Sequence, residues 1–169
     1  MRFELDPQLT PALRRELVEL WTAVSDAGGS VGFVPPVTIE RVEPVASDAF
    51  ARVTEGLDHL VVGYEGKGVV GFGFLESNYS ALRRHWATVK RLQVHPELQG
   101  TGRGGELLDA MATFGRELGY DYLHLTVRGG TGTERFYERH GYETVGRLPN
   151  AIRVGPDDDR DEIYMVRRL

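Results

Sequence analysis

The sequence predicts an α+β fold built on one mixed sheet, and the order of its helical and strand patterns is the main evidence. A short strand and two helices come first, and a run of β-rich segments suited to antiparallel pairing follows. The second half has the order strand, glycine loop, helix, strand, short helix and two strands, which needs one parallel crossover. A chain of 169 residues suffices for one domain, and we expect a single domain over residues 1–169.

The first half of the chain predicts a strand, two helices and a hairpin. Residues 1–5 alternate in the manner of a strand, and residues 7–25 carry apolar side chains at helical spacing with Thr10 as a plausible N-cap. A second helix is expected over roughly residues 39–57. Residues 59–77 form two β-rich runs around a turn with two glycines, which predicts a hairpin.

The second half predicts four strands and two helices. The strands are residues 85–96, 120–128, 142–148 and 162–169, and the helices are residues 104–119 and 131–142. Residues 150–161, with Gly, Pro and four Asp, are expected to form a polar loop. The whole chain therefore predicts about seven strands flanked by about four helices.

Composition excludes several classes of protein. Without Cys there can be no disulfide framework, thiolate zinc site or cysteine nucleophile, and we expect no metal. No apolar run approaches the ~20 residues of a membrane span, and residues 1–17 lack the apolar core of a secretory signal, so a cytoplasmic protein without a membrane partner is expected. A net charge of −5 with scattered Arg residues argues against a nucleic-acid partner.

A glycine-rich loop, Gln99–Gly105, lies between a predicted strand and a predicted helix. Backbone N–H groups at a helix start favour an anion, and residues without Cβ let a pyrophosphate approach. The loop satisfies G-x-G-x-x-G, but a dinucleotide-binding domain needs this motif after its first strand and further βα units behind it. A P-loop is excluded because no Lys-Ser/Thr pair follows. A plain turn from strand to helix is the structural alternative.

The same loop also satisfies Gln99-x-x-Gly102-x-Gly104 and, between "LQVHPELQ" and "ELLDAM", resembles the acetyl-CoA loop of the GNAT superfamily of N-acetyltransferases. The resemblance spans nearly the whole chain, including "YLHLTV", "RFYERHGY" and the terminal hairpin. Within the superfamily the sequence is most similar to acetyltransferases of the tabtoxin-resistance type, through "GGSVGFVPP", "VKRLQVHPELQGTGRG", "LHLTVRGGTGTERFYERHGYETVGRLP" and "EIYMVRRL". The resemblance implies a GNAT fold with a splayed parallel strand pair, and acetyl-CoA as co-substrate.

The resemblance implies two stretches that bind the coenzyme. Pantetheine is expected between the splayed strands Thr88–Val94 and Leu123–Val127, with backbone groups of Leu92, Gln93 and Val94 bonded to its amides. One of these N–H groups would polarise the thioester carbonyl. The pyrophosphate is expected on Gln99, Gly100, Thr101, Gly102, Arg103, Gly104 and Gly105.

Tyr137 matches the tyrosine that many family members direct at the coenzyme sulfur. A phenol has the reach and the acidity to protonate a thiolate, so the resemblance implies that Tyr137 is the general acid. The alternative is that Phe136 and Tyr137 are both core aromatics of a short helix.

The general base is less defined by the sequence. Enzymes of the tabtoxin-resistance type carry carboxylates on the two splayed strands, where this chain has Thr88 and Thr126. Either hydroxyl could orient a water, and Glu76 near the end of the hairpin strand could replace the missing carboxylate or be a solvent-facing strand end. His85 and His124 titrate in a suitable range, although each could equally be structural. The remaining alternative is proton loss through ordered water.

Two segments are expected to roof the acceptor pocket, residues 27–37 and residues 149–162. Apolar side chains in the first should pack either on the core or on a substrate, and Asp157–Asp159 in the second could attract a cationic amine or be a solvated surface loop. The expected acceptor contacts are Val31, Phe33, Glu76, Thr126 and Asn150.

The function that the sequence predicts is an acetyl-CoA-dependent N-acetyltransferase acting on a small amine, amino-acid-like or antibiotic-like, by direct transfer through a tetrahedral intermediate. A protein N-terminus or lysine is an alternative acceptor. A non-catalytic acyl-CoA-binding module is a third possibility, supported by the missing strand carboxylates at Thr88 and Thr126. Exposed edges in the final hairpin make a homodimer plausible.

Overall fold

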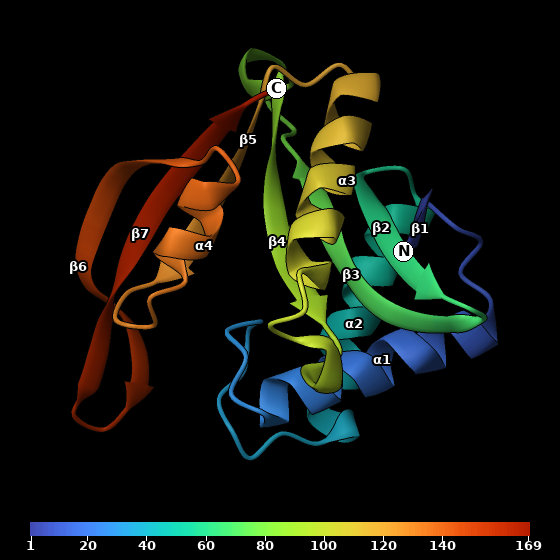
Figure 1. Ribbon diagram of the computed structural model, residues 1–169, viewed down its shortest axis with the longest axis horizontal. Helices are drawn as coiled ribbons and strands as arrows, with labels where there is room; N and C mark the ends of the chain where they lie inside the picture. Colours follow the sequence, from blue (N-terminus) through green and yellow to red (C-terminus); the bar gives the residue numbers. More distant parts are fainter.

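A seven-stranded mixed sheet organises the computed structural model, which describes residues 1–169 (Figure 1). The strand order is β1-β2-β3-β4-β5-β7-β6, and only β4 and β5 run parallel. The strands are β1 (Arg2–Leu5), β2 (Asp58–Glu65), β3 (Gly68–Ser77), β4 (Trp86–Val94), β5 (Tyr122–Arg128), β6 (Glu143–Gly155) and β7 (Asp158–Arg168). The helices are α1 (Pro11–Asp26), α2 (Ile39–Thr54), α3 (Arg103–Glu117) and α4 (Glu134–Arg139). The predicted number and order of the elements are confirmed.

The helices cover both faces of the sheet and enclose two hydrophobic cores. Helices α1 and α2 pack on one face, where Trp21 is fully buried against Phe72 and Phe74 of β3. Helix α3 packs on the opposite face, where it buries Leu107, Leu108 and Met111 (Figure 1). None of the helices combines the length and the apolar character needed to span a membrane.

Helix α1 begins where the sequence predicts. The Thr10 hydroxyl accepts a hydrogen bond from the Leu13 N–H at 3.2 Å, and Pro11 occupies the first turn. The apolar positions predicted from helical spacing face the sheet, and Leu17, Leu20 and Trp21 are buried.

The predicted polar loop at residues 150–161 is wrong, because this segment is the end of a long hairpin formed by β6 and β7. Ion pairs between and along the strands replace the apolar alternation that would have identified it: Arg153 pairs with Asp159 at 2.7 Å, and Arg147 pairs with Asp161 at 2.8 Å. The backbone ladder is interrupted in three places, which hides the period of two in the sequence. The hairpin extends beyond the end of β5 (Figure 1).

Strand β4 diverges from β5 after a short paired stretch. The pairs run from Trp86–Tyr122 to Thr88–His124, and none follows. A bulge lies farther along β4, where Arg91 adopts a φ of +53° and the register with β3 shifts between Phe72 and Phe74. The splayed parallel pair expected from the resemblance is therefore present.

Candidate active site

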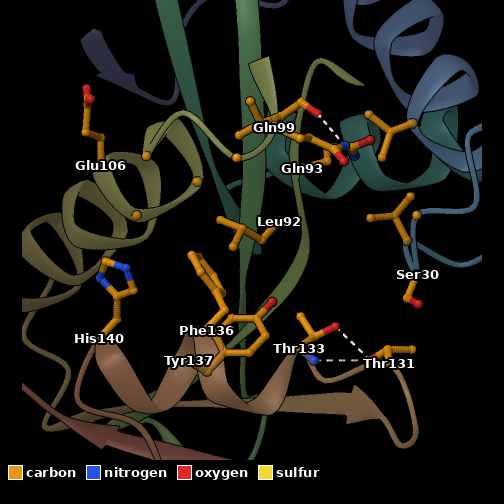
Figure 2. A pocket seen from close by; sticks show the side chains of 18 of the residues that line it. Ser30, Leu92, Gln93, Gln99, Glu106, Thr131, Thr133, Phe136, Tyr137 and His140 are labelled. Carbon is orange, nitrogen blue, oxygen red and sulfur yellow. Dashed lines mark hydrogen bonds between the residues drawn. The ribbon is translucent and has the colours of Figure 1, made fainter. Parts of the chain in front are cut away.

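A cavity of about 940 Å³ lies between the end of β4, the start of α3 and α4 (Figure 2). Leu92, Gln93 and Val94 of β4 line one side, and Tyr137 of α4 lines another. The loop after α1 contributes residues 28–31. The structure thus brings the predicted strand residues, the glycine loop and Tyr137 to one place, although they are far apart in the chain.

The glycine loop presents an uninterrupted series of free backbone donors. The N–H groups of Gly100–Gly104 have no acceptor within the protein, whereas those of Gly105 and Glu106 donate to the Gly102 carbonyl and begin α3. Gly100 and Gly102 have φ values of +75° and +90°, which side chains other than glycine adopt only with strain. Free amides at a helix N-terminus favour an anion, as the sequence predicts for this loop.

The polar side chains of this loop are turned to other partners. Arg103 pairs with Glu106 at 2.7 Å and with Glu65, and the Thr101 hydroxyl donates to the Leu98 carbonyl at 2.6 Å. The side chains of Thr101 and Arg103 are therefore occupied, and neither residue lines the cavity, whereas Gly100, Gly102 and Gly104 do. Gln99 donates from Nε2 to the Val94 carbonyl at 3.1 Å and so fastens the loop to the end of β4.

The Gln93 side chain offers a hydrogen-bond acceptor, whereas the sequence predicted a binding role only for the Gln93 backbone. Its side chain is 3% exposed and its Oε1 has no hydrogen-bond partner, while its Nε2 donates to the Arg91 carbonyl at 3.2 Å. A buried carbonyl oxygen without a donor is costly unless a ligand satisfies it. The free loop amides suit a diphosphate, and Gln93 suits an amide N–H, so these residues fit acetyl-CoA.

Tyr137 and Phe136 of α4 both line this cavity and also pack on the core beneath α3. Their rings meet edge to face with centroids 5.0 Å apart. The Tyr137 hydroxyl points into the cavity (Figure 2), and burial raises its pKa to about 12. Tyr137 is therefore a protonated phenol at neutral pH, able to donate a hydrogen bond to a ligand atom.

The other predicted catalytic residues lie outside the large cavity. The Thr88 hydroxyl lies 3.3 Å from Nδ1 of His124, at the last pair before the strands diverge. Thr126 is paired across the sheet with Tyr164. Glu76 is opposite Thr88 on β3.

His124 is held within a group of aromatic side chains. Its ring stacks on Tyr164 with centroids 5.9 Å apart and meets Trp86 edge to face at 5.7 Å. Burial, with a smaller contribution from Lys90, lowers its pKa below the usual 6.5, so that it is neutral at pH 7. His85 instead packs against Tyr122 at 5.8 Å.

A smaller cavity of about 170 Å³ lies between α2 and the sheet. Glu76 and Arg91 both line it, together with Arg52 and Asp58, which form a close bidentate ion pair. Sequence reasoning missed Arg91, although a basic residue within the β-rich run "VKRLQV" interrupts the pattern of a buried strand.

The expected acceptor contacts on the two roofing segments are not brought together. Val31 is 6% exposed and its carbonyl accepts from the Trp21 indole N–H at 2.9 Å, so it belongs to the core and only borders the large cavity. Phe33 meets the Trp21 ring edge to face and lines neither cavity. Asn150 lies on the β6–β7 hairpin, where its N–H donates to Asp161 at 3.1 Å.

Residues 56–144 match the family model described as an acetyltransferase (GNAT) domain. A ribosomal-protein-alanine N-acetyltransferase from Brucella melitensis has a TM-score of 0.80 with 17% identity, over 100% of both chains. The protein yncA from Salmonella typhimurium, solved with its cofactor acetyl-CoA, has a TM-score of 0.77 with 16% identity, over 99% of this chain and 94% of that one.

An aminoglycoside 6′-N-acetyltransferase complexed with coenzyme A has a TM-score of 0.74 with 18% identity, over 99% of this chain and 97% of the other. These structural likenesses confirm the predicted fold, and the match to the family model covers more than half of the chain.

Proposed function

Because the chain belongs to the GNAT family of acetyltransferases and works with acetyl-CoA, we propose that it transfers the acetyl group directly to the amine of a small molecule. The observation that carries this proposal is the row of unpaired N–H groups at Gly100–Gly104, in the loop that joins the end of β4 to α3. A diphosphate on these donors would leave the rest of the coenzyme along the cavity that Leu92–Val94 and Tyr137 line.

The chain's own groups have distinct tasks in this proposal. When bound, acetyl-CoA supplies its acetyl group as a thioester, which an amine attacks. The backbone of Leu92–Val94, on the side of β4 without a strand partner, would polarise the carbonyl. Tyr137 would donate a hydrogen bond to the departing sulfur, and its raised pKa keeps that hydrogen in place throughout the neutral range.

Glu76 and His124 are the two groups in the region of Thr88 that could take a proton from the amine. Glu76 lines the small cavity and makes only a long contact, 3.8 Å, with the ammonium of Lys90. His124 lies within 3.3 Å of the Thr88 hydroxyl and is neutral at pH 7, as a base must be. We assign the base role to Glu76 because it lines a cavity that can hold an acceptor, with Thr88 and Thr126 as candidates to orient water.

The size of the acceptor cavity favours a small molecule over a peptide. At about 170 Å³, the space next to Glu76 holds several waters or a compact polar group, and α2 covers it. The aminoglycoside 6′-N-acetyltransferase of similar fold takes a small-molecule acceptor by name.

A pair of glycine variants tests the proposal. Gly104→Glu introduces a carboxylate at the anion site, where an added Cβ meets only the Phe136 ring at 3.5 Å, so the fold should be retained. Acetyl-CoA affinity, measured by isothermal titration, should fall by about 100-fold because like charges brought together cost several kcal/mol. Gly68→Glu, in open space on β3, adds the same charge elsewhere and should bind like the unaltered protein.

Release of free thiol with a panel of amines and peptides tests the transfer. Release with small amines supports the proposal, release with peptides alone would replace the acceptor class, and acetyl-CoA binding without release would leave a non-catalytic module. Equal affinity in the two glycine variants would contradict the assigned anion site.

A further inference from the structure

Arg91 is a partly buried cation whose guanidinium pairs with no carboxylate. It lies at the β4 bulge, with its guanidinium 4.8 Å from the Trp21 ring centroid and 5.9 Å from that of Phe74. Burial lowers its pKa, and the more distant carboxylates of Glu76 and Asp58 offset this only in part. The two aromatic faces hold the side chain in position and leave its hydrogen-bond donors unused.

Among the acidic side chains that line the small cavity, Asp58 is compensated by Arg52, whereas Glu76 and the exposed Asp48 are not. Asp58 is 3% exposed and is bound by Arg52, so it adds little net charge to the space in front of Arg91. Glu76 has only the distant Lys90 ammonium as partner. The cavity therefore holds one unpaired cation, Arg91, together with two carboxylates without a close partner, Glu76 on β3 and Asp48 on α2, and this arrangement suits a ligand that carries both charges.

The cavity is adjacent to the coenzyme site through the strand itself. Leu92 and Gln93, the residues that follow Arg91, line the large cavity, whereas Arg91 lines the small one. A ligand bound by Arg91 is thus one residue along β4 from the expected path of the thioester arm.

We propose that Arg91 binds the carboxylate of the acceptor while Glu76 faces its amine, so that the substrates are amino acids and related amino carboxylates. This inference rests on the proposed function, because it names the acceptor class of the same site. A guanidinium binds a carboxylate through two parallel hydrogen bonds, which lysine cannot reproduce and which distinguish an acid from its amide.

The test compares the twenty L-α-amino acids with their carboxamides as acceptors, in the unaltered protein and in Arg91→Met and Arg91→Lys. Methionine keeps an unbranched side chain over Trp21 and removes the charge. For the preferred amino acid we expect Arg91→Met to lower kcat/KM by about 10- to 100-fold, mainly through KM, with the amide unaffected. The kcat/KM of Arg91→Lys should lie between those of Arg91→Met and the unaltered protein. Arg116→Met, on an exposed part of α3, should have the same kcat/KM as the unaltered protein.

An equal loss for acid and amide would show that Arg91 only packs, and would overturn the inference. Transfer confined to amines without a carboxylate would overturn it as well, yet leave the proposed function intact. If no amine releases thiol, the proposed function fails. A second measurement then decides whether Arg91 binds a carboxylate. In a Trp86→Phe background, with coenzyme A present, Trp21 fluorescence should respond saturably to the amino acids and not to their amides. Loss of this response in Arg91→Met supports the site, and no response in either protein contradicts it.

Discussion

At the residue scale, the chemistry depends on a few polar atoms left without partners inside the protein. The Tyr137 hydroxyl, Gln93 Oε1 and the Arg91 guanidinium all lie at or next to the two cavities. The sequence identified Tyr137 because its helix has a recognisable motif. It identified Gln93 only for its backbone and did not identify Arg91, because the orientation of these side chains follows from the β4 bulge, which depends on the register with β3.

Replacing Tyr137 by Phe tests the role of the phenol. Loss of one hydrogen bond to the departing sulfur should lower kcat by about 10- to 100-fold, with the affinity for acetyl-CoA nearly unchanged. Because the pKa of Tyr137 is about 12, the phenol stays protonated below that pH, and the rate profile between about pH 6 and 10 should keep its shape in the variant.

Tyr142→Phe is the matched control, since its buried hydroxyl has no partner and lies outside both cavities. Steady-state kinetics and titration calorimetry provide both readouts. Full activity in Tyr137→Phe would remove Tyr137 from the mechanism.

At the element scale, the sequence predicted helices and buried strands better than the terminal hairpin. Thr10 with Pro11 located the start of α1, and the apolar spacing in α3 located its buried face. Strands β6 and β7 are stabilised by ion pairs at the ends of a polar segment, so the pattern that identifies a half-buried strand is absent. A homodimer through the exposed β6 edge stays a prediction, and so do the likeness to the tabtoxin-resistance type and the single-domain organisation.

The candidate site was predictable only where it depends on a local pattern in the sequence. The glycine loop is local in sequence, and its glycines between a predicted strand and a predicted helix indicated an anion site at the start of α3. The acceptor contacts at Phe33 and Asn150 were inferred from loop position, and tertiary packing places Phe33 against Trp21 and Asn150 beside Asp161. Packing between distant segments is not encoded in local patterns.

At the scale of the whole molecule, burial of His124 links stability to pH. The unfolded chain takes up a proton near pH 6.5, whereas native His124, with its lowered pKa, does so only at lower pH. This contribution to stability is therefore complete above about pH 6.5 and is lost as pH falls through the native pKa. Between about pH 7.5 and 5, the Tm of His124→Gln, measured by circular dichroism, should fall by less than the Tm of the unaltered protein. An equal loss in both proteins would contradict the linkage.

We expect the main-chain amides of Gly100–Gly104 to bind the diphosphate of the coenzyme, and amide NMR reports on each of these groups. In a titration of the ¹⁵N-labelled protein with coenzyme A, these five N–H resonances should show the largest shifts and slower hydrogen exchange, because each gains an acceptor that the protein lacks. If coenzyme A binds while the five resonances stay in place, the diphosphate lies elsewhere and the account of the site is wrong.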